Sequence, residues 1–427
     1  MAATASPLTR LAEQLLEQAK ALDAYNASNN LPPASFDTES FVELPLEVEN
    51  QRRAVIDMAQ DLKRLAQGPR DLLFDLWNMF ADLANFHFIY HHNLPQHVPL
   101  EGTTTYGEIA AAVGVDEVLV RRMLRIAMIN RLFVETPEGR VGHSAASRIL
   151  RLEPAGMDAG GFFIEEMFPA AAKMVEAMKK YPGSGEPNET GFNLAFNTSR
   201  PFYRELQATP ERVRRFGFAM RWFTSGGRFS VDHLVKGYDW AAFDHEGGVL
   251  VDVGGGHGAI TFALAQATKN LRFVVQDLPV VAAQGAKTVP SELQDRVSFQ
   301  AHDFFTPQPV KGADIYFLRT ILHNWSDVQA SRILGQLLPA LKDGSRIVVY
   351  EFLPGDVATT AWTDKQPFNM DMIQAIGFNS IERTASDWAR LFQSVDRRLE
   401  FLGTRTSPGS NMSLIEAQFH EDGNHVA

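Results

Sequence analysis

The chain has 427 residues, which suits about two or three domains, and its 45% hydrophobic and 21% charged residues are typical of a globular protein. Its formal net charge of -11 disfavours nucleic acid and anionic membranes, so we expect neither as a partner. The absence of cysteine excludes disulfides, thiolate metal sites and a cysteine nucleophile. No stretch resembles a signal peptide or a membrane span, so we expect a cytoplasmic protein.

The first quarter of the chain is typical of amphipathic helices. Leucines over residues 8–22 and apolar residues over 55–65 recur at helical spacing on either side of the polar break NNLPPASFDTES. Such narrow stripes bury against another helix, either of the same chain or of a second subunit. We expect a homodimer held by these helices.

Residues 103–149 predict a helix, a turn, a second helix capped by Asp116, and a β-hairpin around a Pro-Glu-Gly turn. This is the outline of a winged helix. Arg121, Arg122 and Arg125 would contact DNA if the module were a regulator. In so acidic a chain we favour a structural module whose arginines face solvent.

From residue 248 the chain alternates between apolar strand candidates and helical stretches. The strand candidates are GVLVDVG, LRFVVQD, RVSFQAHDF, ADIYFLR and SRIVVYEF. This alternation predicts an α/β fold with a doubly wound, Rossmann-like sheet. We therefore expect a helical and winged-helix dimerisation domain over 1–155 and a catalytic domain over 156–427, in which the helical segment 160–240 supplies the substrate pocket.

A glycine-rich turn follows the first of these strands, in VLVDVGGGHGAITFALAQ. Glycines such as Gly254 and Gly256 let the backbone pass close to a ligand. The pattern also fits a dinucleotide fingerprint. Asp252, however, lies two residues before the first glycine and would be an awkward neighbour for a pyrophosphate. A carboxylate suits the amino group and sulfonium of S-adenosylmethionine, which we expect as the cofactor.

Two further acidic residues end predicted strands. Asp277 lies at the tip of the second strand and can accept hydrogen bonds from ribose hydroxyls, although it can instead cap the following helix. Asp303 and Phe304 end the third strand, where they can bind and cover an adenine ring, or simply belong to the strand end and the core. The carboxyl ends of strands are where open α/β sheets bind ligands.

The segment IYFLRTILHNWSD contains the most specific motif. Leu-Arg-x-x-Leu-His-x-Trp after a glycine-rich turn and a strand-end acid resembles the class I small-molecule O-methyltransferases of plants and fungi. The resemblance covers most of the chain and is strongest over 249–390. It implies that His323 is a general base flanked by Glu351 and Glu382. It assigns cofactor contacts to Gly254, Asp277, Asp303, Phe304 and Arg319, and pocket positions to Met220, Met372 and Ile373, beside which we place Phe223.

Methyl transfer is an in-line displacement, so the protein must orient the acceptor oxygen and remove its proton. A histidine can accept the proton of a phenol as transfer begins, and the two glutamates can fix its tautomer. We expect the acceptor to be a hydroxylated secondary metabolite. Two departures from the family pattern are Asn324, where aspartate is usual, and FNSI before ERT, which lacks the usual glycine pair. The second leaves the identity of the acceptor open.

Two alternatives remain. One is the same scaffold repurposed for dehydration or pericyclic cyclisation with a non-reacting cofactor, which the retained histidine disfavours. The other is a regulator that uses the winged helix, which would leave the predicted site without a use. No metal site is expected, because His87 and His91 have helical spacing but no accompanying carboxylate motif.

Overall fold

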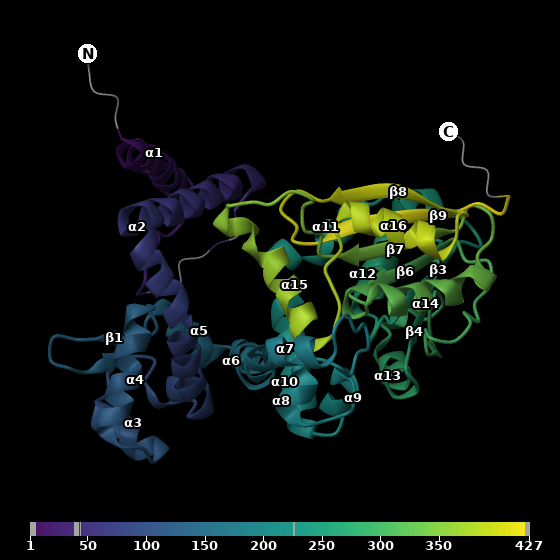
Figure 1. The fold of residues 1–427 in the computed structure, drawn as a ribbon. Helices are drawn as coiled ribbons and strands as arrows, with labels where there is room; N and C mark the ends of the chain where they lie inside the picture. The colour runs from purple at the N-terminus through teal and green to yellow at the C-terminus, as the bar shows by residue number, and fades with distance from the viewer. Residues whose placement is uncertain (1–5, 38–41, 43, 225–226, 423–427) are drawn as a thin grey trace. The chain divides into compact units, whose positions relative to one another are not determined.

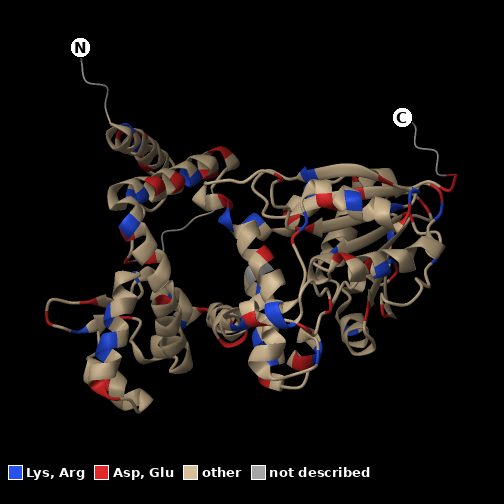
Figure 2. Ribbon diagram, viewed as in Figure 1, with Lys and Arg blue, Asp and Glu red and all other residues tan. Residues whose placement is uncertain are grey.

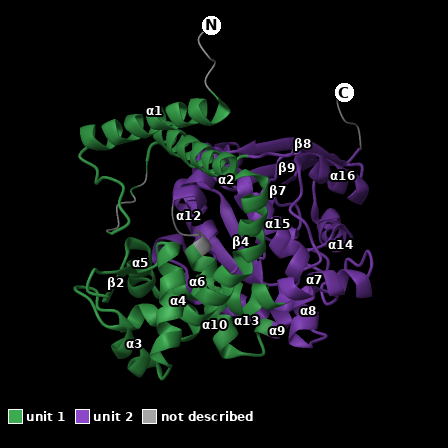
Figure 3. Cartoon of the chain, turned by 60° about the vertical axis from the view of Figure 1, so that its left-hand side comes forward, with its two compact units in different colours: residues 1–169, 206–224, 361–363 green, residues 170–205, 225–360, 364–427 purple. Residues whose placement is uncertain are grey.

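The computed structural model describes residues 6–37, 42, 44–224 and 227–422. They form two compact units, shown in Figure 3. Unit 1 consists of residues 1–169, 206–224 and 361–363, and unit 2 consists of residues 170–205, 225–360 and 364–427. Segments 156–169 and 206–224, expected in the catalytic domain, thus group with unit 1. The domain boundary at residue 155 stays a prediction.

Unit 1 is built mainly of helices (Figure 1). Its elements are α1 (Pro7–Ser28), α2 (Leu46–His91), η1 (Leu94–His97), α3 (Tyr106–Val113), α4 (Glu117–Ile129), β1 (Val134–Glu135), β2 (Val141–Gly142), α5 (Ala145–Leu152), α6 (Pro154–Gly161), the π-helical η2 (Phe162–Met167) and α10 (Pro210–Thr224). The two apolar stripes lie on α1 and α2, which pack against each other. Within α2 the helical backbone is interrupted at Gly68, with φ 70°, just before Pro69.

The expected helix–turn–helix and hairpin are present as α3, α4, β1 and β2. The Asp116 carboxylate accepts hydrogen bonds from the backbone N–H groups of Val118 and Leu119, as a capping residue should. Arg121 pairs with Glu117 on the same helix at 2.6 Å. In Figure 2 the basic residues lie along α4, and acidic residues lie near its start and on α3. The purely structural role of this module stays a prediction.

Unit 2 contains the sheet and the helices that cover it. Its strands are β3 (Val249–Val253), β4 (Arg272–Asp277), β5 (Val297–Ala301), β6 (Ile315–Arg319), β7 (Arg346–Glu351), β8 (Leu399–Thr406) and β9 (Ser413–Phe419). Its longer helices are most of α7 (Phe168–Lys180) and α9 (Phe202–Leu206), and all of α8 (Gly191–Phe196), α11 (Val231–Gly237), α12 (Ala259–Ala267), α13 (Pro279–Gly285), α14 (Asp327–Leu337), α15 (Lys365–Gly377) and α16 (Ala385–Val395). Its short helical turns are η3 (Gly227–Phe229), η4 (Trp240–Phe243), η5 (Ala286–Thr288), η6 (Ser291–Leu293), η7 (Leu322–Asn324) and η8 (Leu338–Ala340), and η9 (Trp362–Asp364) crosses the division between the units.

The seven strands run in the order β5-β4-β3-β6-β7-β9-β8. The first five are parallel, and β9 is antiparallel to both β7 and β8. Alternate residues of β6 enter different cores: Tyr316 packs with α14 and α16, whereas Phe317 packs with α11 and α12. The sheet is therefore covered by helices on both faces, as the α/β alternation predicts. The chain reverses direction of winding at β3, and such a switch point is where ligands bind.

Among the described residues, no helix is long and apolar enough to cross a lipid bilayer.

Candidate active site

The glycine turn after β3 depends on residues without a side chain. Gly254, Gly256 and Gly258 all have positive φ, at 76°, 59° and 80°. A Cβ on Gly254 would lie 2.5 Å from the Cδ1 atom of Ile321. The turn therefore places bare backbone at the carboxyl end of the sheet, directly against the segment that follows β6.

Asp252 lies beneath this turn. Its side chain is 2% exposed, and its carboxylate accepts a hydrogen bond from the Thr261 hydroxyl at 2.6 Å. Burial, together with the nearby Asp277 carboxylate, raises the pKa of Asp252 to about 6. The carboxylate supports the turn from within, and its direct contact with a cofactor stays a prediction.

Asp277 connects the end of β4 to the glycine turn. Its carboxylate accepts hydrogen bonds from the backbone N–H groups of Gly256, at 2.9 Å, and Leu278, at 2.7 Å. The expected alternative, a helix cap, is not formed, because α13 has no side-chain cap. Burial raises the pKa of Asp277.

Asp303 and Phe304 lie just beyond β5. The Asp303 carboxylate accepts from the backbone N–H of Phe305 at 3.0 Å. The ring of Phe304 is 3.8 Å from the Cβ position of Gly254 and 6.0 Å from the ring of Trp325. The structure thus brings the glycine turn and the two predicted strand-end segments to one edge of the sheet.

Arg319 ends β6 at the same edge. Its guanidinium is largely buried, and one Nη atom lies 3.9 Å from the sulfur of Met412. Its Nε–H has no hydrogen-bond partner among the described residues. A buried donor without a partner is costly, which makes this N–H available to a bound group.

His323 lies on η7, immediately after β6. The residue is 6% exposed, and its Nδ1 atom lies 2.8 Å from Oε1 of Glu382. The amide nitrogen of Gln374, on α15, is 3.3 Å from the same Nδ1. Among the described residues, no hydrogen bond involves Nε2 of the ring. The protein therefore holds the imidazole at Nδ1, while Nε2 remains available.

Glu351 contacts the backbone of this turn and not the ring. Its Oε1 accepts from the backbone N–H groups of Ile321, at 3.1 Å, and His323, at 3.2 Å. The two glutamates that the sequence places beside the histidine thus act on different parts of it. Glu382 orients the ring, and Glu351 holds the backbone.

The charges around His323 favour its protonated form. Burial acts against protonation, but the Glu382 and Glu351 carboxylates outweigh it and raise the pKa of the imidazole, while Arg383 lowers it. Glu351 is itself buried, and that burial raises its pKa, with further help from Glu382. The ring is therefore a stronger base than a free histidine.

Two polar residues near His323 were not anticipated from the sequence. Gln374 is 1% exposed and contacts the ring as described. Arg383, directly after Glu382, donates to the carbonyl oxygens of Leu322, at 2.9 Å, and Trp325, at 2.7 Å. The available signal for Arg383 was its place in the ERT motif beside a matched glutamate. Gln374 had no signal, because a helix of mixed polarity does not reveal which face it buries.

The predicted pocket residues are distributed over both units. Met372 and Ile373 lie on α15 next to Gln374, and both are accessible to solvent. Met220 lies on α10 in unit 1 and is half-buried. The side chain of Phe223 lies outside the described residues. Their contact with an acceptor stays a prediction.

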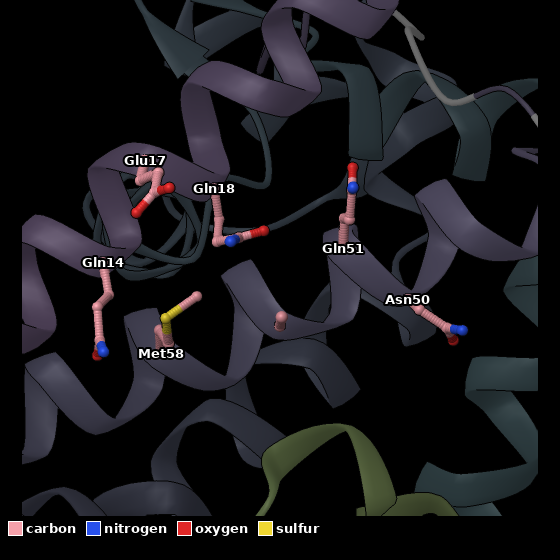
Figure 4. Close-up of a pocket in the computed structure, with 7 residues that line it drawn as sticks. Gln14, Glu17, Gln18, Asn50, Gln51 and Met58 are labelled. Carbon is pink, nitrogen blue, oxygen red and sulfur yellow. The ribbon is translucent and has the colours of Figure 1, made fainter.

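A separate groove lies between α1 and α2 (Figure 4). It is lined by Gln14, Glu17, Gln18, Asn50, Gln51, Ala54 and Met58. None of the predicted site residues lines it, and it offers amides and a single carboxylate. The candidate active site is therefore the edge of the sheet at His323.

Comparison with known proteins gives concordant results. A family model described as an O-methyltransferase domain matches residues 184–396. The chlorophenol O-methyltransferase of Trichoderma longibrachiatum is 35% identical over 420 residues, covering 96% of this chain and 90% of that protein. An O-methyltransferase of Alternaria alternata is 36% identical over 432 residues, covering 97% and 98%.

Solved structures share the fold. The crystal structure of OxaC has a TM-score of 0.77 with 20% identity, covering 96% of this chain and 98% of that one. The structure of LepI in complex with SAM has a TM-score of 0.71 with 24% identity, covering 95% and 99%.

Proposed function

The chain belongs to the S-adenosylmethionine-dependent O-methyltransferase family, and from that premise we propose that it methylates a phenol or enol hydroxyl of a secondary metabolite, with His323 as the general base. The observation that carries the proposal is the 2.8 Å contact between Nδ1 of His323 and the buried Glu382 carboxylate. A carboxylate at Nδ1 requires the proton there, which leaves Nε2 as the acceptor. This is the tautomer that a base needs.

The residues at the edge of the sheet fit S-adenosylmethionine. A Cβ on Gly256 would meet no described atom of the protein within 4 Å, so the backbone there is open to a ligand, and among the described residues the buried Arg319 Nε–H has no partner. Gly254, Gly256, Asp277, Asp303, Phe304 and Arg319 would hold the cofactor. When bound, S-adenosylmethionine supplies a methyl group activated by its sulfonium.

The chain then has to position the acceptor and take its proton. Nε2 of His323 would accept the hydroxyl proton as the acceptor oxygen takes up the methyl group that the cofactor supplies. Glu382 stabilises the imidazolium that results, while Glu351 keeps the turn in place through its two backbone contacts. Met372 and Ile373 contribute apolar contacts to the acceptor.

The proposal extends to a homodimer. The second half of α2 exposes a stripe of large apolar residues at helical spacing: Leu73, Phe74, Leu76, Trp77, Phe80 and Leu83. A patch of this kind on one helix is typical of an interface, and a second copy of the helix would cover it.

One experiment tests the proposed function directly. Purified protein is incubated with methyl-labelled S-adenosylmethionine and a panel of phenolic and enolic metabolites, and products are analysed by mass spectrometry. We expect a labelled product, and we expect His323→Ala to lower turnover about a hundred- to ten-thousandfold while still binding the cofactor. Asp277→Ala should instead weaken cofactor binding. An unlabelled isomer or dehydration product that needs bound cofactor would contradict methyl transfer and indicate the repurposed scaffold.

A further inference from the structure

The turn that carries His323 is held at its backbone by a residue of the ERT motif. We propose that Arg383 is a positioning residue for His323, which fixes the η7 turn through two of its carbonyl groups and balances the charge of the two glutamates around the ring. This inference rests on the proposed function, and it adds to it a residue that never touches the acceptor.

Every nitrogen of the Arg383 guanidinium is engaged. One Nη donates to the Leu322 carbonyl at 2.9 Å, the other to the Trp325 carbonyl at 2.7 Å, and Nε donates to the Asp327 carboxylate at 2.8 Å. The residue is 1% exposed and its guanidinium lies 5.2 Å from the ring centre of Trp388. Because every nitrogen of this buried guanidinium makes a hydrogen bond, the position of the Arg383 side chain on the turn is fixed.

The two carbonyls are those that bracket the catalytic residue, because Leu322 precedes His323 and Trp325 closes the turn. The turn needs this support. Thr320, just before it, has a φ of 50°, which is unfavourable for a β-branched residue. The backbone of the turn itself contributes two hydrogen bonds, from the Asn324 N–H to the Ile321 carbonyl at 3.2 Å and from the Trp325 N–H to the Leu322 carbonyl at 3.1 Å.

Glu382 and Arg383 therefore hold His323 from consecutive positions in the chain. The carboxylate binds the ring and the guanidinium binds the backbone on either side of it. If either contact shifts, the imidazole ring moves relative to the backbone of the turn. This geometry makes the orientation of Nε2 depend on Arg383 even though the two side chains do not touch the same atoms.

The charged groups that act on His323 come from two segments: Glu351 from the end of β7, and Glu382 and Arg383 from the segment between α15 and α16. The two carboxylates raise the pKa of the ring and Arg383 lowers it. Arg383 thus limits how far the glutamates raise the pKa, so that more of the ring is in the neutral form a base requires.

Two substitutions separate position from charge. Arg383→Lys keeps the charge but cannot reach three acceptors in a planar fork. We expect its kcat to fall about 10- to 100-fold, with the rising limb of the pH–rate profile close to that of the wild type. Arg383→Met also removes the charge, so its limb should move to higher pH. The Michaelis constant for S-adenosylmethionine should change little in either, because the proposed cofactor residues lie outside this contact.

Arg405→Lys and Arg405→Met are matched controls. Arg405 is exposed on β8, where it donates to the Gly237 carbonyl at 3.4 Å, and these changes should leave kcat and its pH dependence unaltered. Asp327→Ala removes only the hydrogen-bond partner of the Arg383 Nε atom. This milder variant still tests the inference if Arg383→Lys or Arg383→Met does not fold. We expect it to lower kcat less than Arg383→Lys does.

A readout without turnover keeps the inference separate from the proposed function. Histidine ring resonances of labelled protein are titrated by NMR, and His323 is assigned by its loss in His323→Gln. We expect a higher pKa for His323 in Arg383→Met than in the wild type, and a near-normal one in Arg383→Lys. If no acceptor is methylated, the proposed function fails while this titration still tests Arg383. An unchanged titration in a folded Arg383→Met protein, or unchanged kcat in both variants, would overturn the inference.

Discussion

His323 is made basic by two carboxylates that hold different parts of the same residue. Glu382 contacts the ring at 2.8 Å, whereas Glu351 contacts the backbone N–H at 3.2 Å. The first contact sets the tautomer and the second sets where the ring is. Because they are separable in space, we expect their effects on the rate and on its pH dependence to be separable too.

Glu382→Gln should move the rising limb of the pH–rate profile to lower pH. A general base works in its neutral form, so turnover increases as the pH rises through the pKa of His323. Glu382 raises that pKa, so its replacement by a neutral amide lowers the pKa and activity begins at lower pH. We also expect kcat to fall about 10- to 100-fold, because an amide stabilises the imidazolium less than a carboxylate does and its NH2 group can face Nδ1, which selects the wrong tautomer. The measurement is kcat between about pH 5 and pH 9.

Glu351→Gln is the matched variant. It removes the same charge but keeps an oxygen that can accept the two backbone hydrogen bonds. The rising limb of its pH–rate profile should also shift to lower pH, with a smaller loss of kcat than in Glu382→Gln. Unshifted limbs in both variants would show that the carboxylates do not tune the base.

Asn324, which replaces the usual aspartate, has a use that an aspartate cannot serve. Its Nδ2 donates to the Thr320 carbonyl at 3.0 Å and supports the strained residue. We expect Asn324→Asp to lower the free energy of unfolding by about 1–3 kcal/mol, because a buried donor is lost and a charge is introduced. Urea denaturation of both proteins measures it.

The control for this change is Asn270→Asp. Asn270 donates to the Asp244 carbonyl at 3.1 Å in an exposed position, so the same substitution should cost much less there. Equal losses at the two positions would contradict a specific role for Asn324.

At the level of elements, the segment over residues 378–381, before the ERT motif, stabilises the loop over residues 181–190. Asn379 adopts φ 53°, a conformation that glycine favours, and its Nδ2 donates to the carbonyls of Glu186, at 2.9 Å, and Glu189, at 3.0 Å. The same loop accepts a hydrogen bond from Ser326 at Gly185. In the segment that lacks the usual glycine pair, Asn379 thus adopts a positive φ and makes two contacts that a glycine could not make.

Asn379→Gly should loosen this loop without straining the backbone. We expect faster hydrogen exchange over residues 181–190 in Asn379→Gly and a small loss of stability. Asn379→Ala should show the same exchange and an additional loss of about 1 kcal/mol, because alanine disfavours positive φ. Mass spectrometry of exchange and thermal unfolding measure the two effects. Unchanged exchange in both variants would mean that other contacts hold the loop.

Five of the seven strands in the large sheet were predicted from the sequence. All five predicted parallel strands are present, because buried runs between turn residues have few alternatives. The site was less accessible to prediction. His323 and Glu382 are 59 residues apart in the chain, and their motifs were found by resemblance. No local pattern reveals that Arg383 returns to the backbone of the same turn, since its partners are carbonyl groups, which every residue has.

For the whole molecule, the exposed stripe on α2 determines the expected assembly. Trp77 and Phe80 are each 62% exposed, one helical turn apart. We expect the full chain to sediment as a dimer at micromolar concentration and the double variant Trp77→Asp, Phe80→Asp to sediment as a monomer. Val118→Asp, at an exposed apolar residue of α4, should remain dimeric. A wild-type chain that sediments as a monomer would refute this assembly.

The close approach of Gly254 and Ile321 produces epistasis, because the effect of a substitution at one position depends on the residue at the other. The turn proposed to hold the cofactor and the turn that carries the base meet where a Cβ on Gly254 would lie 2.5 Å from a methyl group of Ile321, so added volume at position 254 depends on the residue at 321. Substitutions in the two turns should therefore be non-additive: a smaller residue at 321 relieves the steric conflict of a substitution at Gly254, while the strain of its positive φ remains. Variation towards new acceptors is then directed to α15, where Met372 and Ile373 are accessible to solvent and belong to neither turn.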